Sequence, residues 1–231
     1  GIKTGFNEAF IIDGEKRAEL IEADPKCAEI IRPILRGRDI KRYNYEFADL
    51  WLINTHNGIK EKGISRIDID DYPTIKAHLD QYWDQISTRA DKGDTPYNLR
   101  NCAYMDDFNK QKIVWIELTD HPNFALDEKG YYINNTVFFM TGENLKYILA
   151  FLNSKICEWY FDKICATSGV GTRRWIKMYI DQICIPVIDD KTCSDIVYLV
   201  DHKTSIEDYE FQINNRFAAI CNLNISEIEW I

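Results

Sequence analysis

The chain has 231 residues, enough for one large domain or two small ones, and it needs no disulfide or metal to bury a core. Hydrophobic residues make up 45% and charged residues 28%, which excludes a disordered or collagen-like chain. No apolar run approaches the roughly 20 residues of a membrane helix, so no membrane partner is expected. The opening Gly1-Ile2-Lys3-Thr4-Gly5 lacks the pattern of a signal peptide, and we interpret it as the cut edge of a longer protein.

The net charge of −9 argues against a nucleic-acid ligand, because phosphate binding depends on basic surface. The charges are unevenly distributed, however. Residues 32–44 hold five basic side chains and one acid, and residues 169–177 hold three basic side chains and no acid. Residues 191–231 hold three basic and seven acidic side chains. Because the local field decides where a polyanion binds, the total charge weakens a DNA hypothesis without excluding it.

The first half of the chain is predicted to begin with two helices. Asp13 is the expected N-cap of the first, and the second is expected from Pro25 to Gly37, whose glycine suits a C-cap. The run Phe47 to Ile53 is aromatic and aliphatic and predicts a strand. A longer helix is predicted to begin at Pro73, because apolar residues recur at helical spacing as far as position 86.

The second half predicts strands followed by a helical tail. Residues 87–100 form a polar loop, and strands are expected at Lys112 to Leu118 and Tyr131 to Met140. A helix follows residues 142–144, and Pro186 indicates an edge strand at residues 183–187.

From about Lys191 the apolar residues follow helical spacing, in one stripe from Ile196 to Lys203 and a second from Ile206 to Ile220. Ser226 and Glu229 have the spacing of a capping box. The predicted fold class is α+β, with a mixed, largely antiparallel sheet, flanking helices and a helical C-terminal segment. We expect residues 1–190 to form one domain and residues 191–231 to pack on it or on a partner.

The sequence contains no pattern typical of a catalytic or metal site. It has no nucleotide-binding glycine motif, no P-loop and no nucleophile elbow. The seven cysteines form no C-x-x-C pair and the four histidines are scattered, which supports neither a zinc site nor a disulfide framework. The odd number of cysteines favours reduced thiols and a cytoplasmic location. The acids Asp68, Asp70 and Asp71 are better explained as a solvated loop than as metal ligands. We therefore predict no catalytic residue, no metal ligand and no cofactor within this chain.

Basic residues interleaved with amides and aromatics are the positive signal for binding. Arginine can pair with guanine, asparagine with adenine, and lysine or arginine with phosphate. These residue types can therefore both position the protein on DNA and read its sequence. The candidate phosphate contacts are Arg38, Lys41, Arg42, Lys112, Arg173 and Arg174. The candidate base or groove contacts are Tyr97, Asn98 and Arg100. The alternative for each cluster is a solvated face or a local salt bridge, such as Arg38 with Asp39.

Five segments in order along the chain resemble one known family. IIRPILRGRDIKRY (30–43) is similar to the "KPxLRGxDIxRY" stretch of the TaqI-like C-terminal specificity domain, and GIKTGFNEAFII (1–12) is similar to its opening. FLNSKICEWYF (151–161) resembles the "LNSxxxxWYF" helix of that family. GTRRWIKMYIDQICIPVI (171–188) resembles "xRWxKxYIxQxPIP", with Cys184 and Ile185 before the proline. The end, 209–231, parallels the family's last helix, with Cys221-Asn222-Leu223 in place of Leu-Tyr-Gly.

The resemblance implies the target recognition domain of a type IIG restriction-modification enzyme. Such a domain places loops in the major groove of double-stranded DNA, opposite an adenine-specific methyltransferase domain of the same chain. That methyltransferase uses S-adenosylmethionine, with Mg²⁺ if a nuclease is fused, and the adenine is flipped out of the duplex. The catalytic tetrapeptide N-P-P-Y is absent here, so the fragment is expected to be catalytically silent. We also expect the fragment to be monomeric. Residues 87–100 lie where such domains vary, so the base-reading residues do not follow from the motifs.

Two other classes of function stay open. The C-terminal amphipathic helices would also suit a protein-interaction or oligomerisation module. The acids at 68–71 leave a small hydrolase as a third hypothesis.

Overall fold

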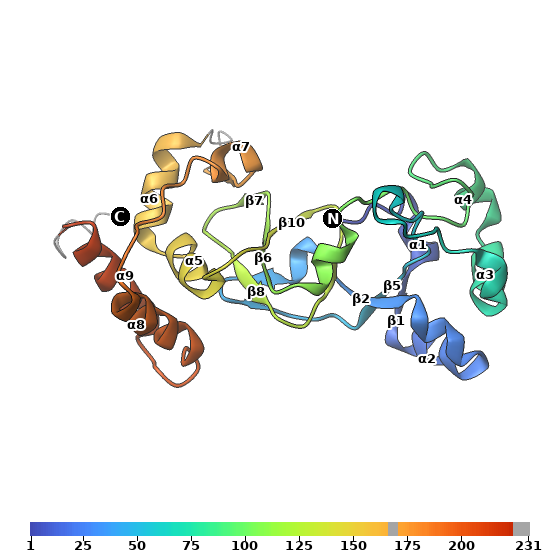
Figure 1. The fold of residues 1–231 in the computed structure, drawn as a ribbon, viewed down its shortest axis with the longest axis horizontal. Coiled ribbons are helices and arrows are strands. Elements are labelled where there is room, and N and C mark those ends of the chain that lie inside the picture. Colours follow the sequence, from blue (N-terminus) through green and yellow to red (C-terminus); the bar gives the residue numbers. More distant parts are fainter. Residues whose placement is uncertain (166–170, 224–231) are drawn as a thin grey trace. The chain divides into compact units, whose positions relative to one another are not determined.

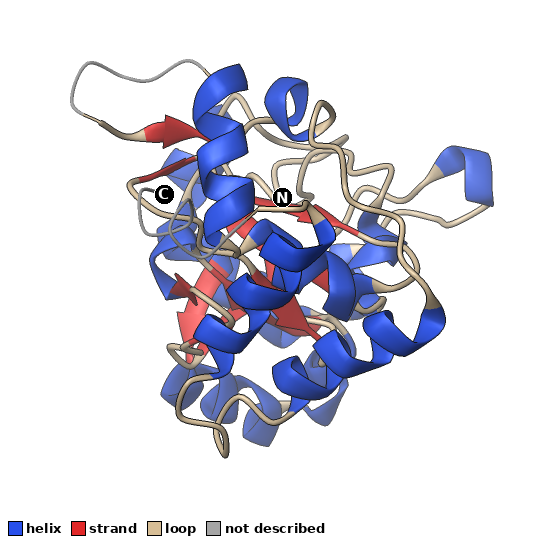
Figure 2. Ribbon diagram, turned by 90° about the vertical axis from the view of Figure 1, so that its left-hand side faces the viewer, coloured by secondary structure: helices blue, strands red, loops and turns tan. Residues whose placement is uncertain are grey.

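A computed structural model describes residues 1–165 and 171–223 of the chain (Figure 1). The chain divides into two compact units that interleave along the sequence. The first unit comprises residues 1–39, 47–110 and 129–137. The second comprises residues 40–46, 111–128 and 138–231, as far as these are described. Helices and short strands alternate with long loops along the chain (Figure 2).

The first unit contains a four-stranded sheet with short helices beside it. Its strands are β1 (Ile11–Asp13), β2 (Ile31–Leu35), β5 (Leu50–Ile53) and β9 (Tyr132–Ile133), in the order β1-β5-β2-β9. Its α-helices are α1 (Asn7–Phe10), α2 (Gly14–Ala23), α3 (Pro73–Asp80) and α4 (Trp83–Thr88). Single-turn 3-10 helices lie at Pro25–Glu29, Gly37–Asp39, Lys60–Lys62, Ile69–Asp71 and Met105–Asn109.

The sheet of the first unit is mixed. β5 pairs antiparallel with both β1 and β2, and β2 pairs in parallel with β9. α2 packs against β1, β5 and α3. Side chains from strands and helices, among them Phe10, Leu52 and Ile75, are completely buried in this core.

The second unit combines three small sheets with the remaining helices. Its sheets are β10-β6-β8, β11-β7 and β3-β4. The strands are β3 (Ile40–Lys41), β4 (Asn44–Tyr45), β6 (Lys112–Ile116), β7 (Leu118–Thr119), β8 (Ala125–Asp127), β10 (Val137–Met140) and β11 (Arg173–Arg174). The helices are α5 (Leu145–Leu152), α6 (Lys155–Ile164), α7 (Lys177–Ile180), α8 (Asp190–Asp201) and α9 (Tyr209–Ile220).

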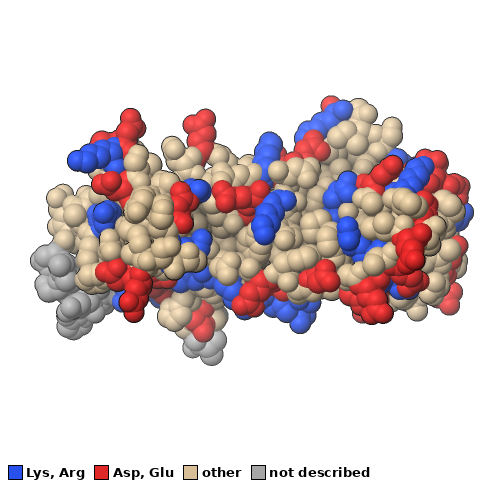
Figure 3. Space-filling model, turned by 90° about the horizontal axis from the view of Figure 1, so that it is seen from below, with Lys and Arg blue, Asp and Glu red and all other residues tan. Residues whose placement is uncertain are grey.

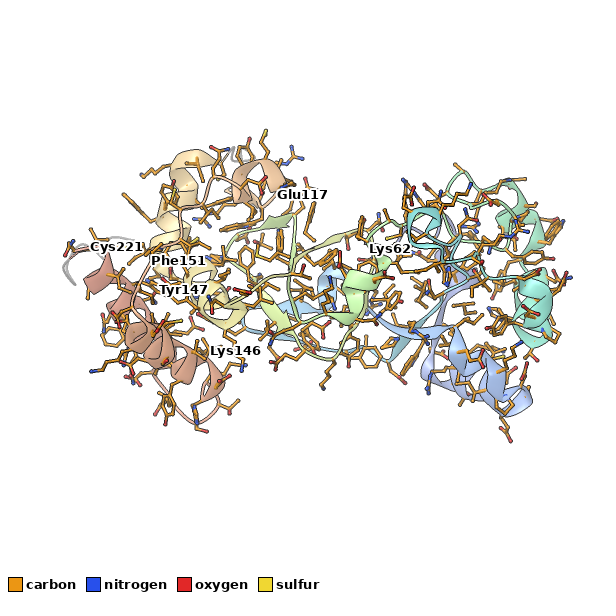
Figure 4. All side chains as sticks on the ribbon, in the orientation of Figure 1. Lys62, Glu117, Lys146, Tyr147, Phe151 and Cys221 are labelled. Atoms are coloured by element: carbon orange, nitrogen blue, oxygen red, sulfur yellow. The ribbon has the colours of Figure 1, made fainter. Side chains whose placement is uncertain are left out.

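Aromatic packing holds the helices of the second unit together. Phe161 of α6 stacks on Trp175, with ring centroids 3.7 Å apart. Tyr147 and Phe151, which Figure 4 labels on α5, both pack against Phe217 of α9. α8 packs on α5, and Lys146 of α5 pairs with Asp201 at the end of α8. The C-terminal helices therefore complete the core of their own unit.

Several sequence predictions are confirmed. The fold class is α+β, with strands that are mostly antiparallel. Asp13 caps α2 by accepting a hydrogen bond from the backbone N–H of Lys16. The helices predicted to begin at Pro73, after residues 142–144 and in the tail are α3, α5, α8 and α9. The division at residue 190 stays a prediction.

The helix predicted from Pro25 to Gly37 is wrong. Only Pro25–Glu29 is helical, as one 3-10 turn, and residues 31–35 form strand β2. Pro33 has no N–H and would interrupt a helix at that point. Pairing with β5 and β9 then decides the conformation, and those partners are distant in sequence.

Four other predicted elements differ from the structure. The run from Pro73 to position 86 is two helices, and Tyr131 to Met140 is two strands joined by a turn at residues 134–136. Lys112 to Leu118 likewise divides into β6 and the start of β7. The strand predicted at residues 183–187 is irregular, with Val187 almost fully exposed. The capping box at 226 and 229 lies outside the described residues.

None of the described helices has the length and apolar composition needed to cross a bilayer. The same residues contain no group of three or more His, Cys, Asp and Glu side chains that could hold a metal ion.

Candidate nucleic-acid interface

Lys112 lies in the interior of the second unit. Its side chain is fully buried on β6 and pairs with the equally buried Asp127 of β8, with 2.5 Å between Nζ and Oδ2. Burial lowers the pKa of the Lys112 ammonium. A buried ammonium that is already paired cannot reach a phosphate, so we leave Lys112 out of the proposed DNA contacts.

Asn98 is also buried, with 1% of its surface exposed. Its side-chain N–H donates to the backbone carbonyl of Ile67 at 2.9 Å, and its carbonyl accepts from the Thr95 hydroxyl at 2.7 Å. Both ends of the amide are therefore used inside the protein. Asn98 supports the loop and has no free edge with which to read a base.

Arg42 and Arg173 hold parts of the second unit together. Arg173 pairs with Glu158 at 2.9 Å and with Asp162 at 2.5 Å, and 15% of its side chain is exposed. Arg42 pairs with Glu210 of α9 at 2.8 Å and donates to the backbone carbonyl of Pro122. Because these contacts join separate segments, the first role of both arginines is structural.

The other candidates are accessible. Arg38 and Lys41 are exposed, and Arg174 is half exposed and pairs with Glu117 at 2.6 Å. Tyr97 packs on Trp83, and its hydroxyl donates to Asp80 at 2.6 Å. An exposed ion pair is weak, so a phosphate could replace Glu117 beside Arg174.

Arg100 is the most accessible of the predicted base contacts, with 55% of its side chain exposed. Its Nη1 lies 3.1 Å from Oδ1 of Asp91. Oδ2 of the same carboxylate lies 2.9 Å from Nζ of Lys3, which comes from the N-terminal segment. These two cations hold the pKa of Asp91 below its usual value. One carboxylate thus brings together two cations that are distant in sequence.

Lys3 and Arg100 line a hollow of about 390 Å³ in the first unit. Asn101, Tyr104 and Asn135 line the same hollow. A second hollow, in which Lys3 and Asn135 also take part, continues along residues 4–8. We call the two together the amide groove. It offers amides, cations and an exposed tyrosine, the side chains that bind phosphates and base edges.

Asn135 was missed because residues 131–140 were predicted as one strand. The turn brings it into the amide groove: Asn134 Oδ1 accepts from the N–H and hydroxyl of Thr136, and Asn134 bridges to Ile2. The hydroxyl of Thr136 accepts from the N–H of Gly37, next to Arg38. The consecutive asparagines were the available signal, since asparagine favours turns.

Charges of both signs cover the surface. Figure 3 shows acidic side chains gathered over the end of the first unit that carries α2, with basic side chains scattered elsewhere on that face. The basic residues on this face do not form one continuous patch. A ligand would therefore be recognised at defined positions such as the amide groove.

Residues 32–187 match the TaqI-like C-terminal specificity domain, which is more than half of the chain. The chain belongs to this family. It is 20% identical over 236 residues to the type II methyltransferase M.BstVI of Geobacillus stearothermophilus, covering all of this chain and 40% of that protein. Among solved structures it resembles the type IIL restriction-modification enzyme MmeI in complex with DNA, at a TM-score of 0.70 and 10% identity. That likeness covers 97% of this chain and 32% of MmeI, and it shows the fold alone.

In this TaqI-like specificity domain, the motif residues are mainly structural. Arg36 pairs with Asp39 at 2.9 Å inside the first motif. In the "LNS" motif, Asn153 bonds to both backbone groups of Phe124, and Ser154 caps α6. These two motifs therefore build the fold. The amide groove is lined partly by the opening segment that resembles the family, residues 1–8, and partly by residues outside the motifs, among them Arg100 and Asn135.

Proposed function

We propose that this chain is the DNA target recognition domain of a restriction-modification protein. Its accessible cations and the amide groove would contact double-stranded DNA. M.BstVI is named a methyltransferase and MmeI was solved with DNA, and each is much longer than this chain. Both relationships support the proposal.

Under this proposal the chain selects sequence and a methyltransferase region of the same protein carries out the chemistry. That region would bind S-adenosylmethionine and methylate an adenine, with Mg²⁺ needed only by a fused nuclease. This sequence has neither the cofactor glycine motif nor the N-P-P-Y tetrapeptide, so the chain itself would be catalytically silent. The type IIG class and a cytoplasmic location, where bacterial DNA lies, form part of the proposal.

The amide groove is the observation that carries the proposal. It combines Arg100, which can pair with two acceptors of guanine, with Asn135, whose amide can pair with adenine. Lys3 supplies a charge for phosphate at the same place. Sequence reading needs such a combination, because phosphate contacts position a protein and base contacts specify the site.

The experiment is an exchange of recognition domains. Placing this chain in a related enzyme, in place of its own specificity domain, should change the methylated sequence, read by sequencing the genomic DNA of the host. An unchanged methylated sequence from a folded, active hybrid would overturn the proposal.

The interaction-module hypothesis finds no support in the C-terminal helices. Ile196, Leu199, Ile213 and Phe217, which form the apolar stripes, are buried in the core of the second unit. The stripes are explained by that core. Sedimentation of the chain as a monomer would agree with this interpretation.

A further inference from the structure

Asp91 does not itself line the amide groove but pairs with two side chains that do, Lys3 and Arg100. Its carboxylate is 20% exposed and contacts both Lys3 and Arg100, one through each oxygen. Within the described residues, no other carboxylate forms an ion pair with either of these two cations. The contact with Asp91 therefore favours one direction for the Arg100 side chain.

Buried contacts fix the backbone of Asp91. Arg89, which is 6% exposed, donates to the backbone carbonyls of Asp91 at 2.7 Å and Asn98 at 2.6 Å, and also to that of Thr4. Arg89 therefore joins the two segments that carry Lys3 and Arg100.

The two segments also approach each other closely at Gly5. Gly5 has φ +72°, and a Cβ on it would lie 3.1 Å from Cβ of Asp91. The two segments therefore pack closely at this point, with little room for a side chain at position 5.

An arginine held in this way suits a guanine. The guanidinium has five N–H donors, and the contact with Asp91 uses the Nη1 end. The remaining donors include an adjacent pair that can bond to O6 and N7 of guanine. An exposed arginine without such a partner would lose more rotamer freedom on binding, so the contact favours recognition by prior ordering.

The carboxylate also opposes unselective binding. Its negative charge offsets one of the two positive charges of Lys3 and Arg100, so the three side chains attract phosphate less strongly than the two cations alone would. A base contact made by Arg100 then contributes a larger share of the binding free energy. Specificity of this kind combines an attractive and a repulsive element.

We propose that Asp91 is a positioning residue for sequence reading, which holds Arg100 for a guanine and Lys3 for a neighbouring phosphate. This inference rests on the proposed function. It adds that the base is guanine, that Arg100 contacts it, and that Asp91 orients Arg100.

The test compares the Asp91→Asn variant with wild type in selection from randomised 20-base-pair duplexes, using the full chain and, in parallel, the hybrid enzyme. Wild type should select a G·C pair at one position. Asp91→Asn should lose about 10-fold of that discrimination, while its affinity for non-cognate duplexes stays equal or rises. Asp91→Glu, which keeps the charge, should recover part of the discrimination. Asp107→Asn is the matched control, since Asp107 lies in the same unit and pairs at 2.7 Å with Lys110, which does not line the groove.

A second readout needs no DNA. The Nη–H NMR signals of Arg100 should be distinct in wild type, because Nη1 contacts Asp91, and move to the position of a free arginine in Asp91→Asn. Unchanged base discrimination in a folded Asp91→Asn, or equal loss at every position, would overturn the role of Asp91 alone. If wild type selects no sequence in either format, the proposed function itself fails. If Asp91→Asn does not fold, Asp91→Glu decides: unaltered discrimination with a displaced Arg100 signal would overturn the inference, and reduced discrimination at the G·C position would support it.

Discussion

Lys112 and Asp127 form an ion pair between β6 and β8, and neither side chain has any exposed surface. The lysine was predicted to contact phosphate, and the structure gives it a partner inside the second unit instead. Removing one member of a buried pair leaves the other charge without compensation in a medium of low polarity.

Lys112→Ala should therefore destabilise the protein by about 3–5 kcal/mol, measured as the free energy of unfolding in urea. Arg174→Ala, which removes an exposed arginine paired with Glu117, should cost less than about 1 kcal/mol. Replacing both buried partners, as in Lys112→Met with Asp127→Leu, should restore most of the stability. A Lys112→Ala variant of normal stability whose DNA affinity has a smaller salt dependence would restore the phosphate assignment.

The variants Arg100→Ala and Lys41→Ala should change DNA binding in different ways. Loss of the base contact at Arg100 should reduce the binding free energy of the recognised sequence by about 1–3 kcal/mol and relax specificity at one position of the site. Lys41→Ala should weaken binding to all sequences alike and reduce the salt slope by about one unit. Binding titrations at several salt concentrations distinguish these results, and identical effects from both variants would contradict the two roles.

Asn98 and Asn135 are the same residue type in opposite environments. Asn98→Ala leaves the partly buried carbonyl of Ile67 without its donor and should cost about 1–3 kcal/mol of stability. Asn135 is exposed, so Asn135→Ala should leave the unfolding free energy within about 0.5 kcal/mol of wild type. Its effect should appear in DNA affinity. The two assays together show whether the groove or the loop interior reads the DNA.

His78 predicts a pH dependence of stability. It is 5% exposed, its Nε2 lies 3.0 Å from the carbonyl of Ala9, and burial lowers its pKa below 6.5. The unfolded chain therefore binds a proton at a higher pH than the folded chain does. Stability is fully present above pH 6.5 and should fall as the pH drops toward the folded pKa, by up to about 1.4 kcal/mol per pH unit.

Thermal unfolding between pH 5 and pH 7.5 measures this slope. His78→Gln should reduce it, whereas His202→Gln, at an exposed position, should leave it unchanged. The half-buried His56, whose pKa partial burial also lowers, supplies the slope that remains. Equal slopes in wild type and His78→Gln would show that His78 is not the titrating group.

Local signals in the sequence determined part of this fold. The N-cap at Asp13, the proline start of α3 and the apolar periodicity of α5, α8 and α9 depend on neighbours within one or two helical turns. The motifs that indicated the family also lie in contiguous segments. Such features can be read along the chain because their physical causes act over a few residues.

Tertiary structure decided which polar residues are available. In the sequence, Lys112 and Asn98 are a cation and an amide beside polar loops. In the folded chain both are buried, and they pair with Asp127 and with the backbone carbonyl of Ile67. The same long-range pairing makes residues 31–35 a strand and brings Lys3, Asn135 and Arg100 into one groove. Burial and hydrogen bonding depend on contacts between distant segments, so only the folded chain separates the residues that build the domain from those that can face a ligand.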